Sequence, residues 1–88
     1  MLLLIDIGNT NIVVGCYENE KITQEARLAT DALKTSDQYC MDLKNLLSLY
    51  EIERASVTGV IISSVVPSLD YTIERMCHLY LGIEPLRI

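Results

Sequence analysis

The sequence predicts a mixed α/β domain, and three features of its hydrophobic pattern indicate this class. Two aliphatic runs, residues 2–5 and 12–17, flank a short turn rich in Gly and Asn, which is typical of a β-hairpin. Two later segments place apolar residues at helical spacing. Between those segments, residues 57–66 form a β-branched run typical of a strand covered on both faces. The expected order is therefore β-β-β-α-β-α-β, with a mixed sheet.

The third strand is expected soon after the hairpin. Residues 18–21 are polar and predict a turn, and residues 22–28 then alternate between apolar and polar side chains. One side of this strand would carry Ile22, Gln24, Ala26 and Leu28. Residues 29–34 lack a clean period, so we interpret them as a connecting loop whose role is open.

Two helices follow from capping signals and apolar stripes. Thr35 and Gln38 fit a capping box at the start of the first helix. Its stripe consists of Tyr39, Leu43, Leu46, Leu47 and Tyr50. The second helix is expected over residues 69–81, with Ser68 as N-cap and Gly82 as the left-handed residue that ends it. Its stripe consists of Leu69, Ile73, Met76, Cys77 and Tyr80. Residues 84–88 would begin another strand.

The length, charge and cysteine content of the chain argue against several classes of function. The 88 residues suffice for one small domain, and if that domain is part of a larger fold, one face should remain apolar. The net charge is −5 and no cluster of Lys and Arg occurs, which argues against a nucleic-acid or anionic-membrane surface. The three cysteines, Cys16, Cys40 and Cys77, have no CxxC spacing, so we expect reduced thiols. No apolar window approaches the ~18 residues of a membrane span, and the expected location is the cytoplasm.

The strongest candidate site is the turn of the N-terminal hairpin. Gly8 has no Cβ, so a ligand can approach the backbone closely, and the N–H groups of such a turn can converge on an anion. Asn9, Thr10 and Asn11 add side-chain donors. Asp6 beside a phosphate site suits Mg²⁺, which binds one or two carboxylates together with substrate phosphates. The alternative interpretation is an ordinary hairpin whose turn is capped by Asp6.

The segment Asp6-x-Gly8-Asn9-Thr10-Asn11 resembles the first phosphate motif of the acetate-kinase, sugar-kinase, Hsp70 and actin superfamily. Within that superfamily it is most similar to the type III pantothenate kinases, as is the segment Ile62-Ser63-Ser64-Val65-Val66-Pro67. The resemblance implies a ribonuclease-H-like fold and the N-terminal part of an actin-like pair of ATPase domains. Because the family's chain is longer, residues 1–88 would be a single, incomplete N-terminal ATP-phosphate-binding domain.

The same resemblance implies a function. The family phosphorylates pantothenate to 4′-phosphopantothenate with ATP, the first step of coenzyme A synthesis, as a homodimer that uses Mg²⁺ and a monovalent cation, K⁺ or NH₄⁺. Asp6 would hold Mg²⁺ directly or through water. The implied phosphate-binding residues are Asp6, Ile7, Gly8, Asn9, Thr10, Asn11, Ile12 and Val13. The implied partner is the small molecule pantothenate, with no nucleic acid and no membrane.

The resemblance also shows what these residues lack. The family's general base lies in a Gly-x-Asp-Arg stretch, and none occurs here, so we expect no catalytic residue in this chain and no activity from it alone. Ser63 and Ser64 are equally interpretable as ligand contacts or as serines satisfied by neighbouring backbone. The lone His78 is interpreted as a boundary or surface residue.

Two other function classes remain open at this point. One is another phosphotransferase of the same superfamily, such as a sugar or acetate kinase, against which the Gly8-Asn9-Thr10-Asn11 turn argues. The other is a non-catalytic regulatory or accessory protein, and the lack of a basic patch argues against direct DNA contact. Neither a P-loop nor a Gly-x-Gly-x-x-Gly fingerprint occurs.

Overall fold

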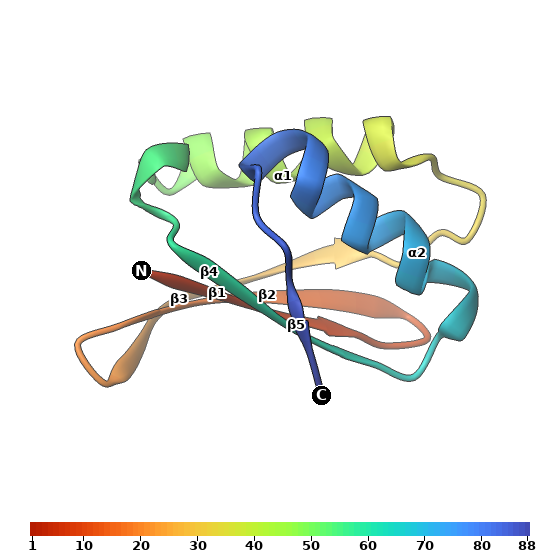
Figure 1. Cartoon of the computed structure of the whole chain (residues 1–88), viewed down its shortest axis with the longest axis horizontal. Coiled ribbons are helices and arrows are strands. Elements are labelled where there is room, and N and C mark those ends of the chain that lie inside the picture. Colours follow the sequence, from red (N-terminus) through yellow and green to blue (C-terminus); the bar gives the residue numbers. More distant parts are fainter.

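The computed structural model describes all 88 residues, which form a mixed five-stranded sheet with two helices on one face (Figure 1). The strands are β1 (Leu2–Ile7), β2 (Asn11–Glu18), β3 (Lys21–Ala29), β4 (Gly59–Ser64) and β5 (Leu86–Arg87). The helices are α1 (Ser36–Leu49) and α2 (Pro67–Met76), and α2 continues into a π-helical turn over Cys77–Leu81. The predicted order β-β-β-α-β-α-β is confirmed.

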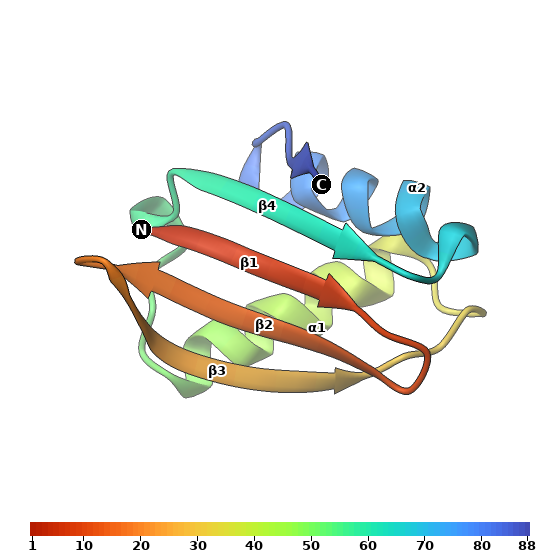
Figure 2. The ribbon, with the colours of Figure 1, turned by 90° about the horizontal axis from the view of Figure 1, so that it is seen from below.

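The strand order in the sheet is β3-β2-β1-β4-β5. The first three strands pair antiparallel, whereas β4 is parallel to β1 and β5 is parallel to β4. Figure 2 views the sheet from the side away from the helices. The β1–β2 turn and the carboxyl ends of β3 and β4 lie at the same edge of the sheet. Carboxyl ends of parallel strands are where ligands bind in open α/β sheets.

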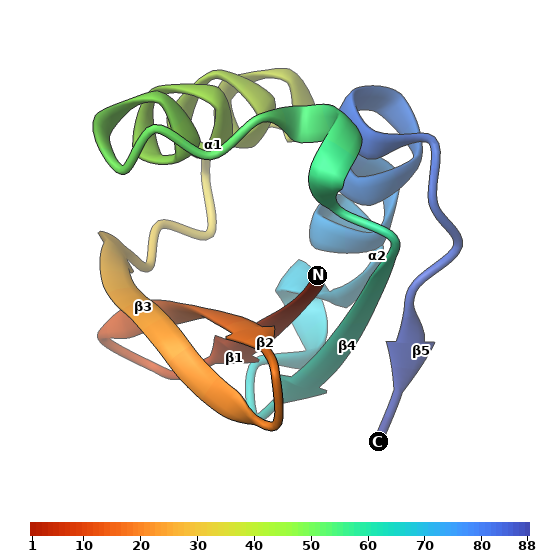
Figure 3. The ribbon, with the colours of Figure 1, turned by 90° about the vertical axis from the view of Figure 1, so that its left-hand side faces the viewer.

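The core lies between the sheet and the helix layer, as the end view of Figure 3 shows. Its largest fully buried side chains are Leu3, Ile5, Ile7, Ile12, Tyr39, Leu43, Ile62, Leu69, Ile73 and Cys77. On β1 these residues alternate with side chains that face the other way, as the two-residue period of a strand requires. Strands β1, β2 and β4 therefore bury one face against the helices, and the expected coverage of β4 on both faces is not observed within the 88 residues.

The opposite face of the sheet carries half-buried apolar side chains. Leu2, Leu4, Val13 and Ile61 lie on this side, and no element of the 88 residues covers them (Figure 2). An apolar sheet face without a covering layer is unusual in a complete two-layer domain. This arrangement is the one expected for part of a larger fold.

Helix α1 begins as predicted. The Thr35 side chain accepts a hydrogen bond from the Gln38 N–H, and the Gln38 side chain accepts one from the Thr35 N–H, which completes the capping box. The first predicted stripe also faces the core: Tyr39, Leu43 and Leu47 are buried, whereas Tyr50 at the helix end is exposed.

The start of α2 differs from the prediction. Pro67 is the first helical residue and Val66 is the N-cap, so Ser68 lies inside the helix rather than capping it. Proline suits the first helical position because its missing N–H would have no partner there and its φ is already helical. The strand before it, β4, spans residues 59–64 rather than the predicted 57–66. Gly82 ends the helical segment with φ +67°, as predicted.

The side-chain alternation along β3 also differs from the prediction. Its register against β2 shifts at Tyr17, which pairs with Ile22 and leaves Thr23 in a bulge. A bulge moves the following side chain to the other face of the sheet. Ile22 therefore lies on the open face near Leu4 and Gly15, not on the same side as Gln24 as the alternation predicted.

The three cysteines are free thiols, two of them buried and Cys40 half-buried, which confirms the prediction. Burial raises the pKa of all three, and that of Cys77 rises to about 12. Neither helix combines the length and the apolar character that a membrane-spanning helix requires.

Candidate functional site

The β1–β2 turn is an open connection rather than a tightly closed hairpin. The Gly8 N–H donates to the Asn11 carbonyl at 2.9 Å, but the Asn11 N–H makes no return bond to the Gly8 carbonyl. A Cβ at position 8 would lie 2.9 Å from the Asn11 carbonyl oxygen, so only glycine fits this approach. Asn9 and Thr10 do not have positive φ, so the turn is not the type I′ that Asn and Gly often form.

The turn presents donors that the chain itself does not use. The backbone N–H groups of Asn9 and Thr10 have no acceptor within the protein. The side chains of Asn9, Thr10 and Asn11 are exposed and also make no hydrogen bond within the chain. Amide N–H groups that converge in a turn are suited to binding an anion such as phosphate.

Asp6 lies on the open face, one residue before the end of β1. Its carboxylate is exposed and accepts no hydrogen bond from the turn, so the capping role considered for it is not observed. In the parallel pair of β1 and β4, Asp6 is in register with Ser63, which is also exposed. The two side chains therefore share one face of the sheet at its carboxyl edge.

The flanking residues of the motif have different surroundings. Ile7 and Ile12 are buried against the helices, so their side chains hold the turn in place and do not face a ligand at the surface. Val13 is half-buried and lies opposite Asp6 on the open face. Of the eight residues named from the resemblance, Asp6, Asn9, Thr10 and Asn11 have exposed side chains.

The structure gives Ser63 and Ser64 different surroundings and shows His78 at the surface. The Ser64 hydroxyl accepts a hydrogen bond from the Val66 N–H, so this serine is satisfied by neighbouring backbone. Ser63 is the serine that faces the solvent beside Asp6. His78 is exposed and contacts Glu84, far from the turn in the fold, in agreement with the surface interpretation.

A residue that sequence reasoning missed lies in the loop after β3. The Thr30 hydroxyl donates to the Gly8 carbonyl at 2.7 Å, and the Thr30 N–H donates to the Thr10 carbonyl at 3.0 Å. These bonds join the loop to both sides of the turn. No local pattern signals them, because they link positions 20 and 22 residues apart in the sequence.

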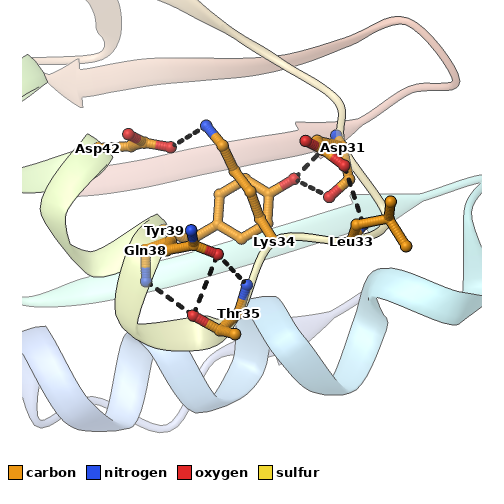
Figure 4. Close-up of polar contacts among 7 residues, drawn as sticks. All are labelled: Asp31, Leu33, Lys34, Thr35, Gln38, Tyr39 and Asp42. Carbon is orange, nitrogen blue, oxygen red and sulfur yellow. Dashed lines mark hydrogen bonds and ion pairs between the residues drawn. The ribbon is translucent and has the colours of Figure 1, made fainter.

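The loop is itself held against α1, as Figure 4 shows. The Tyr39 hydroxyl accepts from the Asp31 N–H at 3.0 Å and donates to the Asp31 carbonyl at 2.8 Å. Lys34 pairs with Asp42 at 2.6 Å, and this hydrogen bond raises the pKa of the lysine. The loop that carries Thr30 is therefore bonded at several points.

The site as a whole combines unused amide donors with one exposed carboxylate. No group of three or more His, Cys, Asp or Glu side chains is placed to hold a metal ion, and the 88 residues form no enclosed pocket. A metal at Asp6 would therefore need ligands beyond these side chains, and the phosphates and waters of a nucleotide complex would supply them. The arrangement fits one end of a metal–phosphate ligand at an open surface.

Comparisons with known proteins match nearly the whole of this chain. The sequence model of the family described as type III pantothenate kinase matches residues 2–88. A type III pantothenate kinase of Brevibacillus brevis is 52% identical over 88 residues, which are 100% of this chain and 34% of that protein. The enzyme of the same name from Finegoldia magna is 46% identical over 86 residues, 98% of this chain and 33% of that protein. The one from Halalkalibacterium halodurans is 40% identical over 88 residues, 100% of this chain and 35% of that protein. The chain thus spans about a third of the length of these relatives.

Proposed function

Because this chain belongs to the type III pantothenate kinase family, we propose that the intact protein transfers the γ-phosphate of ATP to pantothenate. The product would be 4′-phosphopantothenate, at the start of coenzyme A synthesis. The 88 residues would supply the ATP-phosphate-binding turn. The observation that carries this proposal is the pair of unused N–H groups at Asn9 and Thr10, beside an exposed carboxylate at Asp6.

The turn would bind the β- and γ-phosphates. Phosphoryl transfer depends on positioning and on stabilising charge, so donors fixed in the backbone act without reorganising during the reaction. Asn9, Thr10 and Asn11 would add side-chain donors, while the buried Ile7 and Ile12 keep the strands that carry the turn in place. Gly8 permits the close approach of its own backbone to that of Asn11.

Asp6 would hold Mg²⁺, directly or through water, with the Ser63 hydroxyl as its neighbour on β4. The ion, when bound with ATP, neutralises phosphate charge. A single exposed carboxylate fits this role, because Mg²⁺ in nucleotide sites keeps several waters and takes most other ligands from the phosphates. No residue of the 88 is assigned to a monovalent cation.

We extend the proposal to the fold. Three antiparallel strands followed by helix-linked parallel strands support a ribonuclease-H-like domain, the first of an actin-like pair. The uncovered apolar face at Leu4, Val13 and Ile61 supports an incomplete domain, residues 1–88. The remaining length of the relatives would supply the general base, the adenosine and pantothenate contacts, the site for K⁺ or NH₄⁺ and the homodimer contacts. The cytoplasm is the proposed location.

The test begins with the intact mass of the protein made from its natural gene. A mass well above the 9.9 kDa of this chain would identify the protein to assay. That protein, with Mg-ATP and K⁺, is expected to release ADP only when pantothenate is present and to give a product heavier by one phosphate. The 88-residue chain serves as control and is expected to be inactive.

Three outcomes would contradict the proposal. Turnover with acetate or a sugar in place of pantothenate would favour another phosphotransferase of the superfamily. The absence of turnover with every acceptor would favour a non-catalytic protein. An intact mass of 9.9 kDa would mean that the natural product has no general base for the reaction.

A further inference from the structure

Thr30 reaches both sides of the candidate phosphate-binding turn. Its hydroxyl donates to the Gly8 carbonyl at 2.7 Å and its backbone N–H donates to the Thr10 carbonyl at 3.0 Å. The residue is half-buried, and it lies in the loop between β3 and α1 rather than in the hairpin. It contacts the backbone of the turn on the side of β3.

These two bonds determine the direction of two peptide units. In a planar trans peptide the N–H points opposite to the carbonyl of the preceding residue. A Gly8 carbonyl directed at the Thr30 hydroxyl therefore turns the Asn9 N–H away from Thr30. The Thr10 carbonyl, held by the Thr30 N–H, turns the Asn11 N–H away in the same manner.

The bonds also explain why the hairpin is not closed in the usual way. In a two-residue hairpin the residues that flank the turn normally exchange both N–H···O bonds. Here the Gly8 carbonyl is occupied by Thr30, and only the Gly8 N–H bonds to Asn11. Thr30 thus occupies the acceptor that the Asn11 N–H would otherwise use.

We infer that Thr30 is a positioning residue for the phosphate turn: its hydroxyl holds the Gly8 carbonyl and so orients the Asn9 N–H toward a bound polyphosphate, while its backbone N–H fixes the Thr10 side of the turn. This inference rests on the proposed function, because it assumes that the turn binds the phosphates of ATP. It goes further in assigning the preorganisation of the turn to a residue 20 positions away from it in the sequence. Thr30 is not a catalytic residue, since its hydroxyl is already donated to the Gly8 backbone.

A buried tyrosine fixes Thr30 from behind. Asp31, the next residue, is bonded through its N–H and its carbonyl to the hydroxyl of Tyr39, whose side chain is 0% exposed (Figure 4). Tyr39 comes from the first turns of α1. Partly buried hydrogen bonds therefore tie the adjacent residues Thr30 and Asp31 to the turn on one side and to α1 on the other, and satisfied networks of this kind favour a single geometry.

The test compares three variants of the intact protein. Thr30→Val removes the hydroxyl and keeps the shape, and Thr30→Ser restores the hydroxyl. The matched control is Thr23→Val, because Thr23 lies in β3 and its hydroxyl also donates to a backbone carbonyl, that of Cys16 in β2, at the opposite end of the sheet. Thr30→Val is expected to lower kcat/KM for ATP about tenfold, the effect of one well-placed hydrogen bond. KM for pantothenate should not change, Thr30→Ser should recover most of the loss, and Thr23→Val should match the wild type.

A second measurement does not depend on turnover. In the nucleotide-free protein, the amide ¹H–¹⁵N resonances of Asn9 and Asn11 are expected to move in Thr30→Val and to stay in place in Thr23→Val. If Thr30→Val does not fold, Tyr39→Phe loosens the same loop from the helix side and is expected to shift the same resonances and raise KM for ATP.

The outcomes separate the inference from the proposed function. A wild type that phosphorylates pantothenate, with Thr30→Val and Thr23→Val equally active, would overturn the positioning role and leave the kinase proposal intact. Unmoved Asn9 and Asn11 resonances in Thr30→Val would overturn it as well. A wild type that neither turns over nor binds Mg-ATP would overturn the proposed function, and the positioning role with it.

Discussion

Asp6 and Ser63 lie side by side, in register on the parallel strands β1 and β4, and both side chains are exposed at the carboxyl edge of the sheet. The next residue, Ser64, pairs with Ile7 and points the other way, where its hydroxyl accepts from the Val66 N–H. The period of two along a strand therefore divides the adjacent serines between two roles. One serine faces the candidate metal–phosphate site, and the other caps the connection to α2.

The first prediction concerns the Asp6 carboxylate. In the intact protein, Asp6→Asn is expected to lower kcat by at least about a hundredfold, the size typical when an electrostatic group of the transition state is removed. The free energy of unfolding should change by less than ~0.5 kcal/mol, because the side chain is exposed and makes no hydrogen bond. Steady-state ADP release and urea unfolding measure the two effects.

Asp37→Asn is the control, since Asp37 is an exposed aspartate in the first turn of α1 that undergoes the same chemical change away from the turn. Its activity should equal that of the wild type. Unchanged turnover in Asp6→Asn would rule out the metal role.

The second prediction concerns Gly8. A Cβ at this position would lie 2.9 Å from the Asn11 carbonyl oxygen, so Gly8→Ala must spread the two strands apart. We expect a loss of about 1–3 kcal/mol in the free energy of unfolding, the usual range for overpacking. Urea unfolding of the chain followed by circular dichroism would measure it.

Gly15→Ala provides the comparison within the same hairpin. Its Cβ would have no neighbour closer than 3.8 Å, an ordinary contact with Leu4. We expect a change of at most ~1 kcal/mol there, which can be stabilising because alanine reduces the freedom of the unfolded chain. Equal effects of the two substitutions would contradict the steric account of Gly8.

The third prediction concerns the Tyr39 hydroxyl. Tyr39→Phe leaves the Asp31 N–H and carbonyl without their partner, both in a partly buried position. The expected cost is about 1–2 kcal/mol in the free energy of unfolding, because unsatisfied backbone groups lose their bonds without full hydration. Tyr71→Phe is the control, since Tyr71 is 72% exposed. A Tyr39→Phe variant as stable as Tyr71→Phe would show that the loop does not depend on this hydroxyl.

The fourth prediction concerns pH. Burial raises the pKa of the Cys77 thiol from 9.0 to about 12, so the folded protein keeps its proton over a range in which the unfolded chain loses it. This contribution to stability is complete below about pH 9 and is lost as the pH rises toward 12. The free energy of unfolding should fall in that window by up to ~1.4 kcal/mol per pH unit from this group.

Comparison with Cys77→Ala isolates the effect. The variant is less stable at neutral pH because it leaves a cavity, but its stability should depend less steeply on pH between 9 and 12. If the free energy of unfolding depended on pH equally steeply in both proteins, Cys77 would not be the source of the effect. In the native protein at pH 8, a thiol reagent should modify the half-buried Cys40 well before Cys77.

Much of the fold follows from local patterns. The capping box at Thr35 and Gln38, the buried stripes of both helices and the left-handed Gly82 all lie where periodicity and capping chemistry predict them. The start of α2 was predicted wrongly because Ser68 is a good N-cap by composition. Pro67, one residue earlier, fits the first helical position better, and the helix begins there.

The sequence by itself determined the order of the elements, the buried stripes of the two helices and the presence of Gly8 and Asn9 in a turn just after Asp6, because these depend on residues near each other in the chain. Only the tertiary structure decided that Thr30 bonds to Gly8, that Ser63 rather than Ser64 faces Asp6, and that Ile22 lies on the open face. These relationships depend on strand register, on a bulge and on a loop packed against a helix. Such features are set by contacts between distant segments, which no local period contains.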